Sequence, residues 1–469
     1  MTVHLEPFVY LAGLTHDDAL IAWGGFFFQD PDRDGVGWGI VEDPDIQDVV
    51  DEDRRASMGV ESRPFGHAEV QVVEVETGEV AARAATDERN HVWVRGLRPD
   101  TEYRFEVIVD GEPWADGPRW DWLDQGDGPD LVETDRVYDT RFRTHPAPDT
   151  PVSLRFAVLG DYGVGILASG GAGDRQRRLG TALENAVDHA GVSLVITTGD
   201  NIYLGEDDTV AGTGNHDDDW YFSFYEPYRY AISRVPVYPG VGNHDTSDTE
   251  VSDNRDQLAD NLFTNVRFAE GAETDRASLD PGLFYRFSYG SMVHFVAIDS
   301  TMSSDLDQKH FVEHDRHRAF LEEELVDGPD GWVIPFSHHP PYCAGPSHGD
   351  AAHLVDVVVP LLAQGGVPVM FCGHEHNFQH NHVRGIDYVV TGAAGKVREE
   401  RPDRFDEAGT QSWAAEGHFL IVDVDDQQMT IHPVTDVDTD GTFTYLRRTT
   451  PDDQETTAPI TVRRAGRST

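Results

Sequence analysis

Cysteine, lysine and long apolar runs are all scarce in this chain of 469 residues. The two cysteines, Cys343 and Cys372, are too few for a disulfide framework, and both are expected to be small buried residues. No apolar stretch approaches the length of a membrane-spanning helix, and the first residues show no basic region followed by an apolar run. We therefore expect a soluble cytoplasmic protein with no membrane partner, unless a leader precedes this sequence.

Basic residues are few, and acidic residues are abundant. The sequence holds 36 Lys and Arg against 85 Asp and Glu, a net charge of −49, and only Lys309 and Lys396 are lysine. Acidic, lysine-poor surfaces resemble those of proteins from salt-loving organisms, where concentrated salt screens the self-repulsion. A surface built for a basic partner is the alternative. In both cases the charge disfavours non-specific binding to nucleic acid or to an anionic membrane.

Residues 1–147 are predicted to form an all-β domain. Hydrophobic residues make up 39% of the chain and aromatic residues 10%, which is enough for folded domains with their own cores. Short β-type runs occur at residues 19–23, 68–75, 91–97, 104–109 and 140–144. An acidic insertion occupies residues 111–135, and His-Pro-Ala-Pro at 145–148 is expected to be the linker that ends the domain.

A motif within this domain, L-R-P-D-T-E-Y, runs from Leu97 to Tyr103. The pattern L-x-P-x-T-x-Y resembles the E–F corner of fibronectin type III domains, in which the tyrosine hydroxyl bonds back to the backbone. An ordinary turn before an ordinary strand is the alternative. We expect a fibronectin type III-like β-sandwich that carries the acidic insertion.

Residues 148–448 show a different pattern, in which apolar strand-like runs alternate with helix-like segments. The strand-like runs are residues 154–159, 193–197, 293–298, 332–336 and 367–371, and the helix-like segments are 174–189 and 310–325. Buried strands that alternate with helices indicate an α/β layered fold, whose chemistry collects at the carboxyl ends of the strands. Residues 449–469, rich in Thr, Pro, Asp and Arg, are predicted to be a poorly ordered tail.

Five short blocks with metal-ligating side chains follow apolar runs in this region. They contain Asp161 in G-D-Y-G, Asp200 and Tyr203 in G-D-N-I-Y, Asn243 in G-N-H-D, His338 in H-H-P-P-Y, and His374 and His376 in G-H-E-H. Glycines beside the ligands let the backbone turn sharply. Two carboxylates, a phenol, an amide oxygen and three imidazoles suit a pair of first-row transition metals better than Ca or Mg.

The order and content of these blocks resemble the calcineurin-like metallophosphoesterases, and more closely the purple acid phosphatases, over about residues 152–435. In the broad superfamily the first block is usually D-x-H, whereas position 163 here is glycine, which can bind nothing. Tyr203 stands three residues beyond Asp200 instead, and this paired change is the purple acid phosphatase pattern. The resemblance implies a four-layer α/β/β/α sandwich and a phosphoric ester hydrolase.

The resemblance also implies how the ligands are shared between two metal ions. Asp161, Tyr203 and His376 would hold Fe(III), since a phenolate is a hard anionic donor. A divalent Fe, Zn or Mn ion would be held by Asn243, His338 and His374, and Asp200 would bridge the two ions. Such a pair of cations lowers the pKa of a bound water to make hydroxide, orients a phosphoryl group and neutralises charge in the transition state.

Two of these assignments require a choice. Asn215 and His216 repeat the letters of the third block, but they lie in a Gly/Asp-rich segment with no strand before it, so Asn243 is preferred. His339 stands beside His338, and the family spacing H-x-P-x-Y favours His338. His339 would then be a hydrogen-bonding neighbour.

Two further histidines are candidates for catalysis by the resemblance. His244 resembles the family histidine that binds the substrate phosphate, although a loop histidine that bonds its neighbours is the alternative. His348 is near the place of a leaving-group acid in plant-type members, and a plain surface histidine is its alternative.

The leading hypothesis is thus hydrolysis of small phosphate monoesters at a dinuclear metal site. A phosphodiesterase, or a nucleotide- or phospholipid-directed hydrolase, is the alternative on the same site. A metal-containing binding or adhesion module belongs to another class of function, and the intact set of seven ligands speaks against it. The sequence does not define the oligomeric state.

The net charge of −49 leads to a prediction about salt. The melting temperature should rise as NaCl increases from about 0.1 M to about 1 M, because the screening length falls from about 10 Å to about 3 Å. Thermal unfolding measured across this series tests the prediction. Efficient refolding and full stability in dilute buffer would contradict it.

Overall fold

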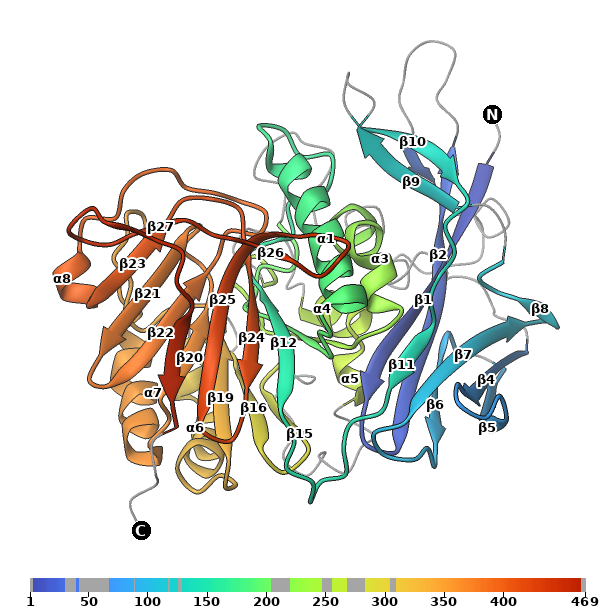
Figure 1. Ribbon diagram of the computed structural model, residues 1–469, viewed down its shortest axis with the longest axis horizontal. Helices are drawn as coiled ribbons and strands as arrows, with labels where there is room; N and C mark the ends of the chain where they lie inside the picture. The colour runs from blue at the N-terminus through green and yellow to red at the C-terminus, as the bar shows by residue number, and fades with distance from the viewer. Residues whose placement is uncertain are drawn as a thin grey trace.

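The computed structural model describes residues 3–29, 39–41, 67–87, 89–116, 119–124, 129–203, 220–246, 255–267, 283–303 and 309–464. The early strands lie beside the larger body formed by the rest of the chain (Figure 1). Asn215 and His216 fall outside the described residues.

The N-terminal domain is built from two antiparallel sheets. One holds β1 (Val3–Leu14), β2 (Asp18–Gln29), β3 (Gly39–Val41) and β6 (His91–Arg95). The other holds β4 (Ala68–Glu74), β5 (Val80–Thr86), β7 (Glu102–Val109), β8 (Glu112–Pro113) and β11 (Arg141–Arg143). Val9, Ile21, Val70 and Phe105 meet between them in one core, so the predicted all-β domain is present.

The turn before β7 has the hydrogen bond that the motif predicts. The backbone N–H of Arg98 donates to the hydroxyl of Tyr103 over 2.9 Å. The acidic insertion forms a hairpin of its own, β9 (Arg119–Asp124) with β10 (Pro129–Thr134).

The larger body contains two mixed sheets. The first has the order β14 (Val237–Pro239), β13 (Val195–Thr197), β12 (Leu154–Leu159), β24 (Phe419–Val424), β25 (Gln428–Val437) and β26 (Phe443–Tyr445), with β29 (Ile460–Arg463) also paired to β25. The second has the order β15 (Tyr285–Tyr289), β16 (Val293–Ile298), β19 (Trp332–Ser337), β20 (Val369–Cys372), β22 (Ile386–Thr391), β21 (Phe378–Val383), β23 (Thr410–Ala414), β27 (Arg448–Thr449) and β28 (Glu455–Thr456). A small pair, β17 (Met302–Ser303) and β18 (Lys309–His310), stands apart from both.

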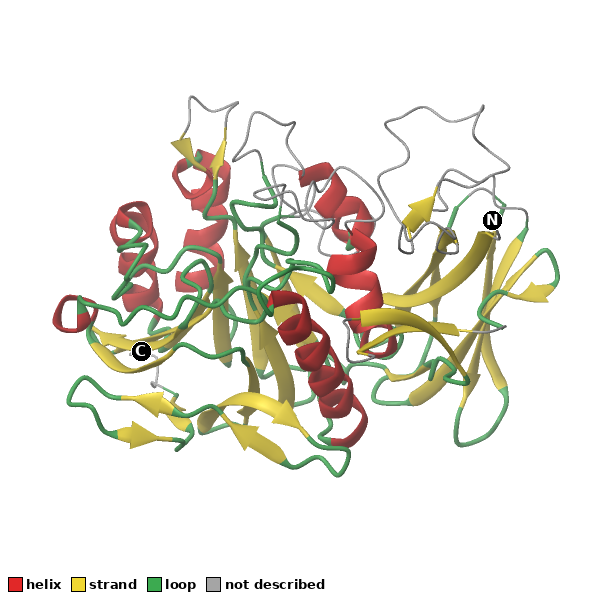
Figure 2. Ribbon diagram, turned by 90° about the horizontal axis from the view of Figure 1, so that it is seen from above, coloured by secondary structure: helices red, strands yellow, loops and turns green. Residues whose placement is uncertain are grey.

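The helices cover the outer faces of these sheets (Figure 2). They are α1 (Ala172–His189), the π-turn η2 (Tyr221–Tyr225), α3 (Glu226–Ile232), α4 (Arg255–Asn261), α5 (Thr264–Arg267), the 3₁₀ turn η5 (Phe311–Glu313), α6 (Asp315–Leu321), the π-turn η6 (Glu322–Val326), α7 (Ala352–Gly365) and α8 (Phe405–Ala408). No helix among the described residues is long and apolar enough to cross a membrane.

Alternation along β12 shows how the layers form. Phe156 and Val158 point into a core shared with Phe295 and Phe371 of the second sheet. Ala157 points to the opposite face and packs in the core that contains α1 and α3. A third core joins the second sheet to α6 and α7, which completes the four-layer α/β/β/α sandwich.

Two expectations about local structure need correction. The predicted helix at 310–325 is divided, because His314 has extended backbone angles between η5 and α6. The predicted disordered tail is wrong for residues 449–464, since Ile460 and Val462 are buried and β29 pairs with β25 over four residues.

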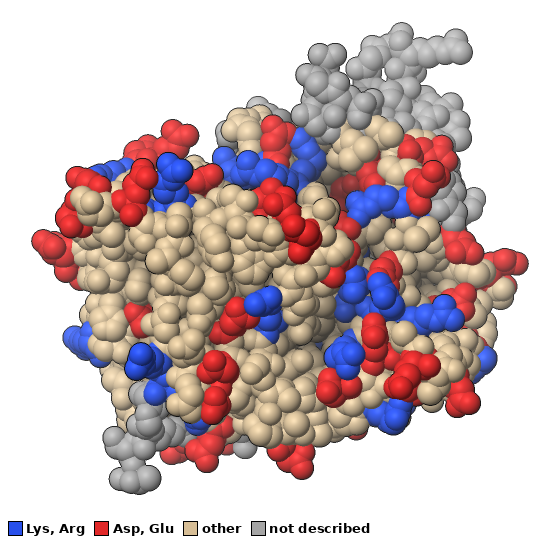
Figure 3. Space-filling model, viewed as in Figure 1, with Lys and Arg blue, Asp and Glu red and all other residues tan. Residues whose placement is uncertain are grey.

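The surface carries charges of both signs. On the face in Figure 3, basic side chains lie among acidic ones and do not gather into one block. Arg155 illustrates this, with its Nε 2.6 Å from an oxygen of Asp423.

Candidate metal centre

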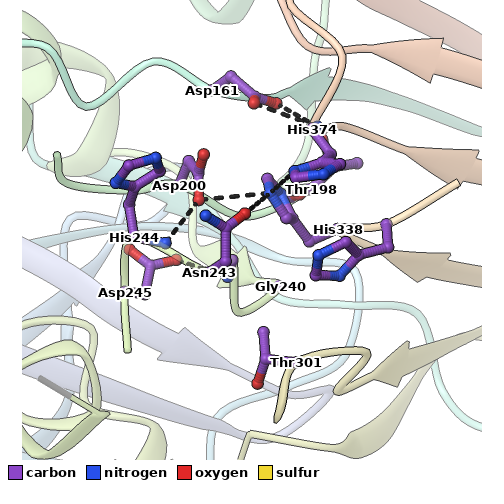
Figure 4. A network of polar contacts seen from close by, with 12 residues as sticks. Asp161, Thr198, Asp200, Gly240, Asn243, His244, Asp245, Thr301, His338 and His374 are labelled. Carbon is purple, nitrogen blue, oxygen red and sulfur yellow. Dashed lines mark hydrogen bonds and ion pairs between the residues drawn. The ribbon is translucent and has the colours of Figure 1, made fainter. Parts of the chain in front are cut away.

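The five ligand blocks meet at one edge of the two sheets. Asp161, Asp200 and Asn243 follow β12, β13 and β14, which run parallel to one another. His338 follows β19 and His374 follows β20, which are also parallel. Because the carboxyl ends of parallel strands lie at the same edge, side chains from distant parts of the chain converge there (Figure 4).

One group of donors surrounds Asp161. Its Oδ1 lies 3.3 Å from the hydroxyl of Tyr203 and 3.5 Å from Nε2 of His376. The same tyrosine hydroxyl is 3.2 Å from Nε2 of His376. Three side chains from three loops thus direct their polar atoms to one point.

A second group surrounds His338. Its Nε2 lies 2.8 Å from Oδ1 of Asn243 and 3.1 Å from Nδ1 of His374. The other ring nitrogen, Nδ1, is 2.9 Å from the carbonyl oxygen of Thr198. A carbonyl only accepts, so Nδ1 carries the proton and Nε2 offers a lone pair, the usual arrangement of a metal-ligating histidine.

Asp200 connects the two groups. Its Oδ1 is 3.4 Å from Nε2 of His338. Asp161, Asp200 and His376 also each offer a ligand atom within 4.8 Å of the other two. The carboxylate of Asp200 therefore lies close to donors of both groups.

The chemistry of the donors fits cations. Burial and the nearby carboxylate of Asp200 raise the pKa of Asp161 well above its usual range, and burial lowers the pKa of His338 and brings that of His376 to about 3. In the absence of a cation, the buried carboxylates would repel each other, and the lone pairs of the neutral imidazoles would face other hydrogen-bond acceptors. A metal ion removes both penalties, since it stabilises the carboxylate anions and accepts the imidazole lone pairs.

The backbone around the site is strained. Asp161, Asp200 and His374 have φ angles of 55°, 52° and 71°, in the left-handed region that non-glycine residues rarely adopt. Such conformations cost about 1–3 kcal/mol each and persist where the surrounding structure imposes them.

Gly163 is required by a close approach between two ligand loops. A Cβ at this position would lie 2.2 Å from the backbone oxygen of Asn201, next to Asp200. A histidine therefore has no room at position 163 in this backbone. Tyr203 belongs to the loop that Gly163 contacts, and its hydroxyl lies beside Asp161 in the ligand cluster.

The two catalytic candidates border the clusters. The ring of His244 lies 4.6 Å from that of Tyr203, and its backbone N–H donates to Asp200. The ring of His348 stacks on that of His374 at 3.8 Å. His339 points elsewhere, because its Nδ1 is 2.9 Å from the hydroxyl of Ser300.

Three residues near the site were not predicted. Glu375 is buried, accepts the backbone N–H of His348 and lies 3.3 Å from Nδ1 of the same histidine. Asp245 accepts backbone N–H groups of Asn201 and Gly242 and so joins two ligand loops. The ammonium of Lys396 lies 3.8 Å above the ring of Tyr203.

Signals for two of these residues exist in the sequence. Glu375 lies inside the G-H-E-H block, and Lys396 is one of only two lysines. Asp245 follows His244 directly, but only the folded structure shows that its carboxylate faces the neighbouring loop.

Comparisons with known proteins agree with this fold and site. Residues 154–378 match the sequence profile of the calcineurin-like phosphoesterases. The chain is 25% identical to mouse tartrate-resistant acid phosphatase type 5 over 308 residues, which are 61% of this chain and 88% of that protein.

Solved structures share the fold. The structure of PhoD superposes with a TM-score of 0.61 at 12% identity, covering 97% of this chain and 91% of that one. Purple acid phosphatase PPD1 from yellow lupin (Lupinus luteus) gives a TM-score of 0.57 at 13% identity, covering 95% of this chain and 73% of that one.

The layered fold and the loops at its edge agree with the match of residues 154–378 to the calcineurin-like phosphoesterases. The chain carries a calcineurin-like phosphoesterase domain and resembles the purple acid phosphatases among its relatives. The family implies a dinuclear metal site, and the donors around Asp161 and His338 fit one.

Replacement of Gly163 by alanine tests the packing of the ligand loops. The added Cβ would displace the backbone at Asn201, so metal bound per chain should fall, as measured by elemental analysis. Gly417→Ala is the control, because the three atoms nearest to its Cβ all belong to the flexible side chain of Arg175. Equal metal content in both variants would contradict the role given to Gly163.

Proposed function

We propose that this protein hydrolyses small phosphate monoesters at a dinuclear metal site. One observation carries the proposal: two groups of buried and half-buried donors from five loops are connected by the carboxylate of Asp200. Relatives named acid phosphatase and purple acid phosphatase support the same reaction.

The proposed ligands follow the two groups. Asp161, Tyr203 and His376 bind one ion, and Asn243, His338 and His374 bind the other. Two bound cations supply the charge that activates water and offsets the charge of the phosphoryl group. Side chains around the two ions carry out the remaining steps.

His244 and His348 are the proposed groups that act on the substrate. His244, beside Tyr203, is placed to bind the phosphate oxygens. His348 donates a proton to the leaving oxygen. Nδ1 of this ring lies 3.3 Å from a carboxylate oxygen of Glu375, so Nε2 is the nitrogen left to reach the leaving group.

The ion at Asp161 is proposed to be Fe(III), with a divalent Fe, Zn or Mn at His338. The phenol of Tyr203 supports this choice, because a phenolate is a hard anionic donor. Burial and the carboxylates of Asp200 and Asp161 raise its pKa well above 10, so only a strongly charged ion would hold it as phenolate.

Activity tests the reaction and the site together. The wild type should hydrolyse p-nitrophenyl phosphate faster than its bis ester, and Asp200→Asn and His374→Ala should each lose at least about a thousandfold in kcat/KM. His382→Ala is the control, an exposed histidine paired with Asp387.

Two outcomes would count against the proposal. Unchanged activity in both site variants would exclude the metal centre as the catalyst. A diester rate far above the monoester rate would favour the phosphodiesterase alternative.

The visible spectrum tests the choice of metal. The purified protein should contain iron and show a broad band at long visible wavelength, which Tyr203→Phe should remove. Tyr342→Phe, a buried tyrosine that packs on Tyr388, should keep the band. A colourless wild type with two Zn or Mn ions would keep the hydrolase and exclude Fe(III).

A further inference from the structure

A cavity lies between the N-terminal domain and the larger body. Its volume is about 510 Å³, within the range of small-molecule sites. Leu14 and Trp93 line it from the N-terminal domain, and Tyr238, Arg267 and Phe287 line it from the other side. Linker residues before β12 complete it, whereas Asp161 follows the other end of β12, so the cavity is separate from the metal centre.

Arg267, at the end of α5, is the unusual group in this cavity. It is 6% exposed, and its Nε and Nη1 find no hydrogen-bond acceptor among the described residues. Its Nη2 donates to the hydroxyl of Tyr10 over 3.3 Å. The guanidinium also lies 4.9 Å from the centroid of the Tyr238 ring. Burial raises the pKa of Tyr10 to about 12, so both partners are neutral and neither supplies a negative charge.

The other polar groups of the cavity do not supply the missing anion. Asp18 is already paired with Arg95 at 2.6 Å, and Asp17 accepts a hydrogen bond from Thr15. His145 is 3% exposed, and its Nε2 also has no hydrogen-bond partner within the described part of the chain. In a chain with a net charge of −49, a buried cation that meets no carboxylate among the described residues is unexpected.

Burial of a guanidinium that has only neutral partners is unfavourable, so its presence calls for an anionic ligand that compensates it. We propose that this cavity binds a small molecule with an oxyanion group, a phosphate or a carboxylate, paired with the guanidinium of Arg267. The apolar walls at Leu14, Trp93 and Phe287 suit an apolar body attached to that group. The bound ligand bridges the two domains, and it stabilises the folded state by mass action.

Binding of inorganic phosphate and of benzoate to the holoenzyme tests the proposal by isothermal titration calorimetry. At least one probe should show a binding event that Arg267→Met weakens by about tenfold or more, the loss expected for a hydrogen-bonded charged pair. Arg83→Met is the matched control, since that arginine lies outside the cavity, is 55% exposed and is paired with Glu69, and it should keep the event. Any binding of phosphate at the metal centre should be the same in all three proteins. Failure of the proposed phosphatase function can therefore be distinguished from loss of binding in this cavity.

Stability without ligand is the second readout. Arg267→Met should melt at an equal or higher temperature than the ligand-free wild type, because it removes an unpaired buried charge. If Arg267→Met does not fold, Pro148→Trp on the exposed rim narrows the cavity and should weaken the same event. Absence of binding by both probes, or binding that Arg267→Met and Pro148→Trp leave unchanged, would overturn the proposal. If the substitutions weaken only the binding of phosphate, the ligand is an inorganic anion. If they weaken the binding of benzoate, the ligand is an organic carboxylate.

Discussion

The structure of the larger body depends on the electron-pair donors that gather at one buried edge of its two sheets. Asp161 and Asp200 are 1% exposed or less, and His338 turns a lone pair toward Asn243 and Asp200. These contacts would be unfavourable without a cation and favourable around one. A metal centre at this place would therefore contribute to the energetics of the fold as well as to the proposed catalysis. Bound cations would compensate the charges that the strand ends bring together.

This constraint explains the local backbone. Loops that follow parallel strands must turn at once to place their ligands inward, which accounts for the left-handed angles at Asp161, Asp200 and His374. It also accounts for glycine at 163, where the backbone of one ligand loop contacts that of the next. The carboxylate of Asp245 then joins the Asp200 and Asn243 loops through backbone N–H groups. Its burial, together with the nearby carboxylate of Asp200, raises its pKa to about 8.

Much of this arrangement could be predicted from the sequence, because each ligand follows a short apolar run, and parallel strands collect such ends at one edge. Spacing also predicted a ligand at His338 and a hydrogen-bonding neighbour at His339, and only the structure shows that Ser300 contacts His339. Strand β29 was missed because only Ile460 and Val462 mark it in a polar segment. The role of Glu375 was missed because its partner His348 lies 27 residues away, and the pairing depends on tertiary structure.

The N-terminal domain is attached by more than its linker. The outer face of β1 presents Phe8 and Tyr10 to aromatic rings of η2, with Phe8 6.0 Å from Tyr221. Beside them Arg229 of α3 forms buried ion pairs with Glu6 of β1 and Asp121 of β9. A charge buried in this way is tolerated only while its partners stay in place, so separation of the domains would expose apolar rings and leave unpaired ions at once. Since α3 packs on α1, and α1 covers the sheet that carries Asp161 and Asp200, the β-domain supports the layer on which the metal centre rests.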